Sequence, residues 1–269
     1  YMALGNVFIK DTDGRLPSAT STSNEKITGL LFDVSKQPEL FTAGYGKSNE
    51  SKLKLGDVCY ITSRAQAIKD YGIIERVECG EEDEATKNFM FGIPAYHIAE
   101  FFRMSGNIDG YGKLYVMFAD CSSNWDAIEI MQRASGGTIS QLGIWTEQPL
   151  WKKSEETYLL NIVKTVNEKA ELLATQNQPL SLVLSASCAN TGTDDSEGKK
   201  VDLNKIPTCI CDSSRTSVII GQARNELIST MQMRNKNCTP VGFLGSVMGC
   251  IAKANVCLLY TSDAADDLI

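Results

Sequence analysis

One stretch of the sequence ends like a phosphate-binding loop: Phe-Thr-Ala-Gly-Tyr-Gly-Lys-Ser at residues 41–48. In such a loop the glycine-rich backbone surrounds the phosphates of a nucleotide, and the motif needs glycine at its first position and a strand directly before it. Phe41 occupies that first position, and no convincing strand precedes it. We therefore expect that Lys47 does not bind a nucleotide.

A nucleophilic serine is the second chemistry to consider. Gly245-Ser246-Val247-Met248-Gly249 places a serine between two glycines, but a nucleophile elbow has one residue between the serine and each glycine. His97 is the only histidine, so a serine triad would have to use it, and a site of several histidines is excluded. We interpret His97 as a helix-surface or partly packed imidazole and expect no catalytic residue.

The remaining candidate groups are thiols and carboxylates. Cys209 and Cys211 would face the same side of a strand, but no second cysteine pair lies nearby to complete a zinc site. The acidic residues 81–84 and 194–195 lack the alternating oxygen ligands and glycine of a calcium loop. We expect buried thiols and solvated loops, with neither a metal nor a cofactor.

Composition narrows the class of protein. With 269 residues, 43% hydrophobic and 22% charged, the chain can bury one large core or two moderate ones. Its formal net charge of -7 disfavours nucleic acid and anionic membrane surfaces as partners. No apolar run reaches the ~20 residues of a membrane-spanning helix, and no signal-peptide pattern opens the chain. The nine cysteines are scattered and odd in number, which is typical of reduced thiols.

The two ends are expected to differ from the rest. Met2 resembles a natural start, so we expect Tyr1 to come from upstream translation. Residues 1–26 hold a short apolar run, a turn and a Ser/Thr-rich segment, which together indicate an N-terminal arm. Residues 257–269 resemble the translated frame of a transposon-end adapter used in sequencing libraries, so we expect the native chain to be interrupted near Val256.

Apolar runs bounded by turn residues predict alternating strands and helices. The expected strands are residues 27–34, 58–61, 88–93, 114–119, 142–145, 180–184 and, as a central strand, 217–221. The expected helices begin after Ser63 as N-cap, surround Ile98, and cover residues 125–134, 154–176 and 239–253. Residues 78–84 and 189–200 are expected to be loops.

The helix expected at residues 154–176 has the clearest periodicity. Apolar residues recur on one of its faces, at Leu159, Val163, Val166, Ala170 and Leu173. Strands are expected on both sides of it, which indicates a right-handed parallel crossover. The sequence therefore predicts an α/β fold, a mixed sheet flanked by helices, with Val163, Val166 and Leu173 buried and the Asp194-Asp195 loop exposed.

The last expected helix has Thr239 as N-cap and Pro240 in its first turn. Gly242, Gly245 and Gly249 are spaced so that a neighbouring backbone can approach this helix closely. Each glycine lowers helix propensity by up to ~1 kcal/mol, so packing must compensate.

The order of these motifs resembles the core of contractile tail sheath proteins of phages and related injection machines, including a sheath-like group long catalogued as a domain of unknown function. In that family a strand leads into a short Ser-led helix that ends on an aromatic-Gly pair, as at residues 61–72. A later helix with two adjacent aromatics precedes a Tyr-Val strand, as at residues 95–103 and 112–117. Residues 217–221 and the Pro-led, glycine-containing helix resemble the later core.

The resemblance implies a structural subunit that polymerises helically around an inner tube and contracts to drive it through a membrane. Residues 27–256 would be the sheath-like core, in one or two lobes, incomplete at its C-terminus. The partners implied are further copies, the tube protein, and baseplate and tail terminator proteins, assembled in the bacterial cytoplasm into a virion tail or injection machine. The arm residues Leu4, Val7, Phe8 and Ile9 would contact a neighbouring subunit.

Two alternatives stay open from the sequence. The chain could be a small-molecule or nucleotide-binding α/β enzyme whose site lies in an unseen C-terminal part. It could also be a non-contractile structural protein of a phage particle.

Overall fold

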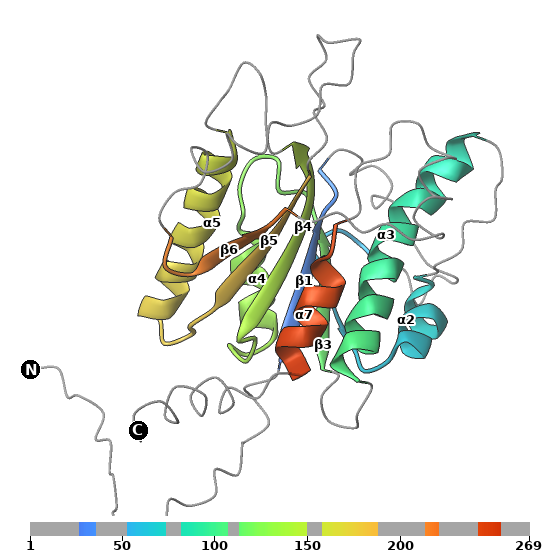
Figure 1. Cartoon of the computed structure of the whole chain (residues 1–269), viewed down its shortest axis with the longest axis horizontal. Helices are drawn as coiled ribbons and strands as arrows, with labels where there is room; N and C mark the ends of the chain where they lie inside the picture. Colours follow the sequence, from blue (N-terminus) through green and yellow to red (C-terminus); the bar gives the residue numbers. More distant parts are fainter. Residues whose placement is uncertain are drawn as a thin grey trace, which may run out of the picture.

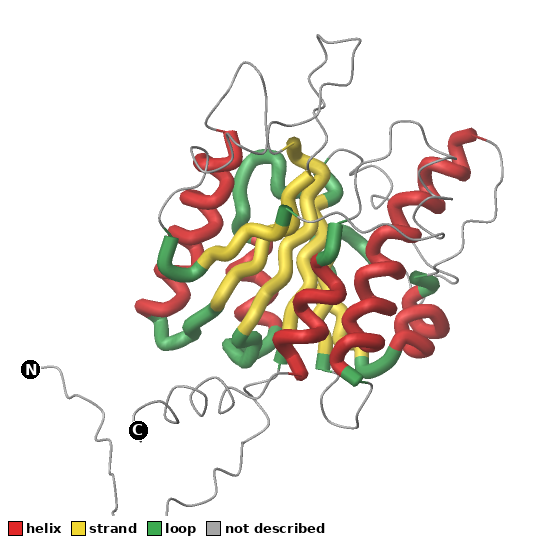
Figure 2. The backbone as a smooth tube through the Cα atoms, viewed as in Figure 1, coloured by secondary structure: helices red, strands yellow, loops and turns green. Residues whose placement is uncertain are grey.

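The fold was examined in a computed structural model, which describes residues 27–35, 53–73, 82–106, 113–149, 158–187, 213–220 and 242–253 (Figure 1). These residues form a sheet with helices on both faces, as the sequence predicts (Figure 2). The expected arm, the Asp194-Asp195 loop and residues 257–269 lie outside the described residues.

The sheet has six strands in the order β2-β3-β1-β4-β5-β6. Their bounds are β1 Thr28–Asp33, β2 Val58–Ile61, β3 Leu114–Ala119, β4 Gln141–Pro149, β5 Ser181–Ser187 and β6 Thr216–Ile219. β2 pairs with β3 in antiparallel orientation, and the other neighbours pair in parallel. The predicted mixed sheet is therefore confirmed.

Helices cover both faces because the strands are apolar on both sides, as buried parallel strands require. Alternate residues of β1 divide between two cores: Leu30 and Phe32 belong to one, and Leu31 to the other. The first core lies under α2 (Arg64–Tyr71), α3 (Glu82–Ser105) and α7 (Leu244–Lys253), and the second under α4 (Ala127–Ala134) and α5 (Tyr158–Thr175). Figure 1 shows the first group in front of the sheet.

The long helix α5 connects two parallel strands, as expected. β4 and β5 pair in parallel, with Leu142 opposite Leu182 and Ile144 opposite Leu184. Val163 and Val166 are fully buried and Leu173 is 3% exposed, so the predicted inner face is confirmed.

The short helix α2 has the caps that the sequence predicts. The side chain of Ser63 accepts a hydrogen bond from the Gln66 amide at 3.2 Å, and Gln66 Oε1 in turn accepts one from the Thr62 amide at 2.8 Å. Gly72 ends the helix in the left-handed region at φ 68°, which glycine adopts without strain. Ser63 is therefore confirmed as the N-cap.

Several element predictions were wrong. Residues 88–93, expected as a strand, lie inside α3, which also includes residues 82–84 of the expected acidic loop and continues through Pro94. A short apolar run does not distinguish a strand from a buried helix, and Ile93 at its end is buried in the first core.

The predicted central strand β6 is instead an end strand of the described sheet and is only partly buried. The last helix begins at Leu244, so Thr239 and Pro240 are outside it and outside the described residues. Gly242 precedes that helix with φ 75°, so it belongs to the turn and not to a helical glycine stripe.

Leu173→Ala should lower the free energy of unfolding by about 2–5 kcal/mol, because it leaves a cavity between α5 and the sheet. Leu172→Ala is the matched control, since Leu172 is 44% exposed on the same helix and its removal should cost less than about 0.5 kcal/mol. Urea unfolding followed by circular dichroism measures both. Equal losses in the two variants would contradict the assigned inner face.

Candidate functional site

The close contact between α3 and α7 brings together a histidine, a glutamate, an arginine and a serine. A Cβ atom built on Gly249 would lie 2.5 Å from the carbonyl oxygen of Phe101, and one on Gly245 would meet the carbonyl oxygen of His97 more closely still. Glycine at these positions therefore lets the backbones of α3 and α7 touch. We call this contact the α3–α7 seam; it comprises His97, Glu100, Phe101, Arg103, Gly245, Ser246 and Gly249.

His97 is fully buried in this seam, which corrects its interpretation as a surface or partly packed residue. Its Nδ1 atom accepts a hydrogen bond from the Gly245 amide at 3.1 Å. Its ring stacks on Phe32 of β1 with centroids 6.1 Å apart. An accepting Nδ1 places the proton of a neutral ring on Nε2. His97 thus links both helices to the sheet.

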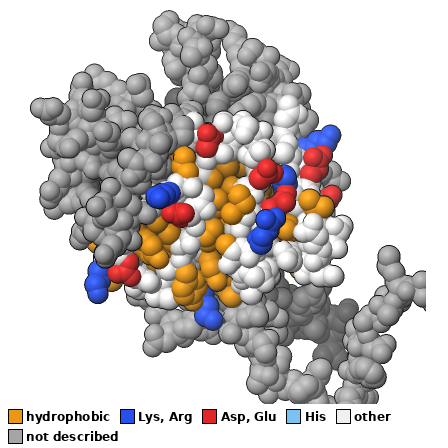
Figure 3. Space-filling model, turned by 180° about the vertical axis from the view of Figure 1, so that it is seen from behind, with side chains coloured by type: hydrophobic (Ala, Val, Ile, Leu, Met, Phe, Trp, Pro, Cys, Tyr) orange, Lys and Arg blue, Asp and Glu red, His pale blue; other side chains and the backbone are white. Residues whose placement is uncertain are grey.

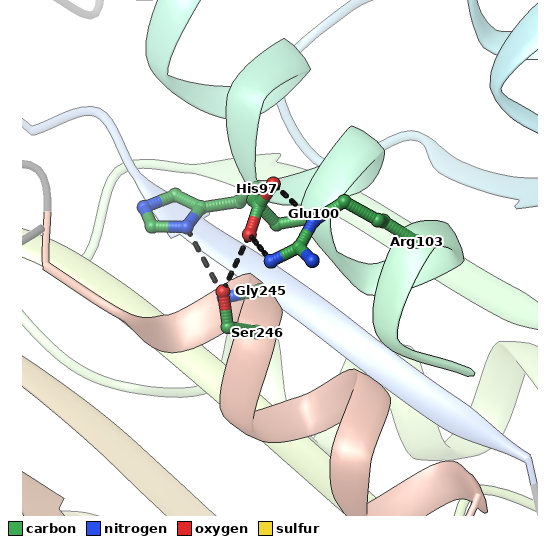
Figure 4. Close-up of polar contacts among 5 residues, drawn as sticks. All are labelled: His97, Glu100, Arg103, Gly245 and Ser246. Atoms are coloured by element: carbon green, nitrogen blue, oxygen red, sulfur yellow. Dashed lines mark hydrogen bonds and ion pairs between the residues drawn. The ribbon is translucent and has the colours of Figure 1, made fainter. Parts of the chain in front are cut away.

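Glu100 lies one turn further along α3 and collects the polar contacts at the rim of the seam. It accepts hydrogen bonds from Ser246 Oγ at 2.8 Å and from Arg103 Nε and Nη2 at 2.8 and 2.6 Å (Figure 4). The hydrogen bond from Arg103 lowers the pKa of Glu100 below its usual value, and the Ser246 hydroxyl adds to this effect. The carboxylate side chain is 16% exposed and the guanidinium side chain 63%.

The seam is arranged to join helices. Ser246 Oγ donates to Glu100, while the Nδ1 atom of His97 faces the Gly245 amide (Figure 4). A serine nucleophile needs its base in direct hydrogen-bond contact, and these two side chains are engaged elsewhere. The geometry therefore fits a polar clamp between α3 and α7, and the side chains beside Gly245 and Ser246 do not form a serine triad.

A buried carboxylate that the sequence analysis missed lies at the carboxyl end of the sheet. Asp33 is 1% exposed, and its oxygens accept hydrogen bonds from the Ser35 and Cys121 amides at 3.1 and 3.2 Å and from Thr146 Oγ1 at 2.7 Å. It therefore connects the ends of β1, β3 and β4. An acidic residue at the end of an otherwise apolar run, Leu30-Leu31-Phe32, was the signal that could have identified it.

Asp33 also marks the place where the chain order reverses. After β1 the chain forms β2 and β3 on one side of it, and then crosses to form β4, β5 and β6 on the other. In doubly wound sheets, ligands bind outside the carboxyl ends of the strands at such a switch point. Residues 36–52 and 150–157, which follow β1 and β4 there, lie outside the described residues.

The face of α4 and α5 has a different character. Hydrophobic side chains gather in the middle of this face, with charged side chains around them (Figure 3). Lys169 of α5 donates to Asp126 and Glu129 at 2.6 Å each, which connects the two helices. Asn167 holds β6, since its Oδ1 accepts from the Arg215 amide at 3.0 Å and from Thr216 Oγ1 at 3.3 Å.

The structure does not describe several of the residues singled out in the sequence. The arm residues Leu4, Val7, Phe8 and Ile9, the loop at 41–48, and Cys209 and Cys211 lie outside the described residues. Within the described residues, no group of three or more His, Cys, Asp or Glu side chains could hold a metal ion. No helix of this part of the chain is long and apolar enough to cross a membrane.

The described cysteines are free thiols. Burial raises the pKa of Cys59 to about 12 and that of Cys121 further above its usual range. These two thiols therefore stay protonated at neutral pH, whereas Cys250 on α7 is exposed.

Gly245→Ala should destabilise the protein although alanine is the better helix former. The added methyl group meets the His97 carbonyl, and such overpacking costs about 1–3 kcal/mol against a propensity gain of up to about 1 kcal/mol. Ser246→Ala, the adjacent control, adds no atom and should cost about 0.5–1.5 kcal/mol. An unchanged or higher free energy of unfolding in Gly245→Ala would refute the close contact.

Glu100→Gln should lose stability in a pH-dependent way. Because the pKa of Glu100 is lowered in the folded protein, its contribution is complete above the unfolded value of about 4.3 and disappears as pH falls through the folded value. The difference in free energy of unfolding between wild type and variant should therefore be constant from pH 6 to 8 and shrink below about pH 4.3. Chemical unfolding at each pH provides the measurement.

Comparison with known proteins does not add a relative: no protein-family model matches the chain, and no curated protein is significantly similar to it.

Proposed function

We propose that this chain is the structural subunit of a contractile tail sheath. It would polymerise helically around an inner tube and contract to drive that tube through a membrane. The proposal keeps the partners implied by the sequence: further copies of the chain, the tube protein, and baseplate and tail terminator proteins. It requires no catalytic residue and no cofactor.

One observation carries the proposal. The stretches that carry the resemblance are residues 61–72, and residues 95–103 with 112–117. The strands of these stretches are neighbours in the sheet, because β2 pairs with β3 from Val58 opposite Met117 to Ile61 opposite Leu114. The first continues through the capped helix α2 to Tyr71 and Gly72, and the second is preceded by α3 with its adjacent Phe101 and Phe102. The motifs thus form one structural unit, as expected of a shared core.

The two ends of the described sheet also suit a polymer. β2 and β6 are its end strands, and Tyr60 of β2 is 36% exposed beside Tyr115 of β3. A strand from a neighbouring subunit can pair with such an edge, and a contact that repeats without closing builds an open helix. The proposed source of that strand is the arm containing Leu4, Val7, Phe8 and Ile9.

A helical lattice whose subunits can pack in two alternative ways would supply the mechanical work. Assembly in an extended packing stores free energy, and the contracted packing releases it when subunits rotate as rigid bodies. The seam and the Asp33 contacts would keep each subunit rigid during that change, since they join α3, α7 and three strands through buried groups.

A second candidate is a small-molecule or nucleotide-binding α/β enzyme. The observation in its favour is Asp33, a buried carboxylate at the switch point of the sheet. Calorimetric titration with ATP separates the two functions: the sheath proposal expects no saturable binding. Binding abolished by Lys47→Ala would support the enzyme.

The sheath proposal is tested on the full-length protein, with its native C-terminus, by negative-stain electron microscopy. Wild type should form tubes, and Phe8→Glu should yield folded subunits without tubes, because a charge is placed in the lent strand. Asn6→Glu is the charge-matched control at an already polar position and should still polymerise. If Phe8→Glu still forms tubes, the arm has no role in assembly. If the wild-type protein does not polymerise even with its tube protein, the proposed sheath function is wrong.

A further inference from the structure

The hydrogen bond between His97 and Gly245 exists in one protonation state of the histidine only. Nδ1 accepts from the Gly245 amide at 3.1 Å, and an imidazole nitrogen accepts only while it carries no proton. We infer that the α3–α7 seam is an acid-sensitive switch, in which protonation of His97 removes the acceptor for the Gly245 amide and releases the first turn of α7 from α3. This inference is independent of the proposed function.

The surroundings of His97 make the protonated state a poor fit. The side chain is fully buried and stacks on Phe32. A proton on Nδ1 would point at the N–H of Gly245, so two donors would face each other. The backbones of the two helices lie so close here that a Cβ atom on Gly245 would meet the His97 carbonyl. Repulsion between the two donors therefore favours separation of the two helices.

The charged groups on the elements around His97 do not replace the lost acceptor. On α3, Glu100 already accepts from Arg103 and Ser246, and the hydrogen bond from Arg103 keeps its pKa low. On β1, Asp33 is engaged with backbone amides and Thr146 at the carboxyl end of the sheet.

The remaining titratable neighbours are Tyr96, in edge contact with the His97 ring, and, on α7, Cys250 and Lys253. Glu100, one turn along α3, interacts electrostatically with His97, and the hydrogen bond from Arg103 keeps the pKa of Glu100 below its usual value. The NMR signals of the ring report the protonation of His97 separately from that of Glu100.

The expected change is local. α7 covers β4 and β5 on one face, where Leu244 and Met248 are buried. α4 and α5 pack on the opposite face through a separate core. Loss of the His97 contact should therefore loosen α7 while α4 keeps its packing.

The chain has a single histidine, so the state of His97 can be observed directly in untagged protein. ¹⁵N-edited NMR of the imidazole should show the neutral ring with its proton on Nε2 at pH 7.5. Hydrogen exchange followed by mass spectrometry, corrected for intrinsic rates, then compares α7 with α4 from pH 7.5 to 5. Exchange of α7 should rise by up to about tenfold per pH unit as the ring protonates, the slope for uptake of one proton.

His97→Asn is the matched variant, because its amide oxygen can accept from the Gly245 amide and does not titrate in this range. Its α7 exchange should change by less than about twofold over the same pH range. A ring that protonates without faster exchange in α7, or exchange that rises equally in α7 and α4, would overturn the switch. An α7 exchange rate that depends equally on pH in wild type and in His97→Asn would also overturn it. If the variant does not fold, the NMR and hydrogen-exchange data on the wild-type protein decide the question.

Discussion

The direct backbone contact between α3 and α7 is the constraint on which the front layer of the molecule depends. Gly245 and Gly249 allow it because a side chain at either position would meet a carbonyl group of α3. Close approach lets His97 reach the Gly245 amide and lets Glu100 reach Ser246. The two helices, far apart in sequence, are thereby held as one layer over the sheet.

The sheet itself is held together at its carboxyl end by a buried charge. Asp33 accepts hydrogen bonds from neighbours on both sides of β1, so its burial is compensated. The apolar side chains of β1 determine which residues face each core, but they do not determine how the ends of β3 and β4 align with the end of β1. The Asp33 carboxylate adds this information about register, because Cys121 and Thr146 can both reach it only when the three strand ends are aligned.

These features describe layers joined by buried contacts, with β2 and β6 as the end strands of the described sheet. Such a body suits a polymer whose subunits change their mutual packing, which agrees with the sheath proposal. The polar groups in the seam are engaged with backbone and neighbouring side chains, so their evident role is to position helices. His97 is the exception with a chemical consequence, because its contact depends on protonation.

Local patterns in the sequence were sufficient to predict a structural feature where a single residue or the helical repeat of apolar residues determines it. Ser63 and Gly72 set the ends of α2, and the spacing of Val163, Val166 and Leu173 set the inner face of α5. The glycine spacing of the last helix also predicted a close backbone neighbour, although not that the neighbour is α3.

Tertiary structure alone decided the identity of partners distant in sequence. The apolar run at residues 88–93 fits a strand or a buried helix equally, and in the structure it belongs to the helix α3. The position of β6 at the end of the sheet, the burial of His97 and the role of Asp33 likewise depend on which segments lie beside them. Short-range periodicity records which face of an element is apolar, whereas strand order and buried hydrogen bonds arise from contacts between residues far apart in the sequence, such as Asp33 with Thr146 and His97 with Gly245.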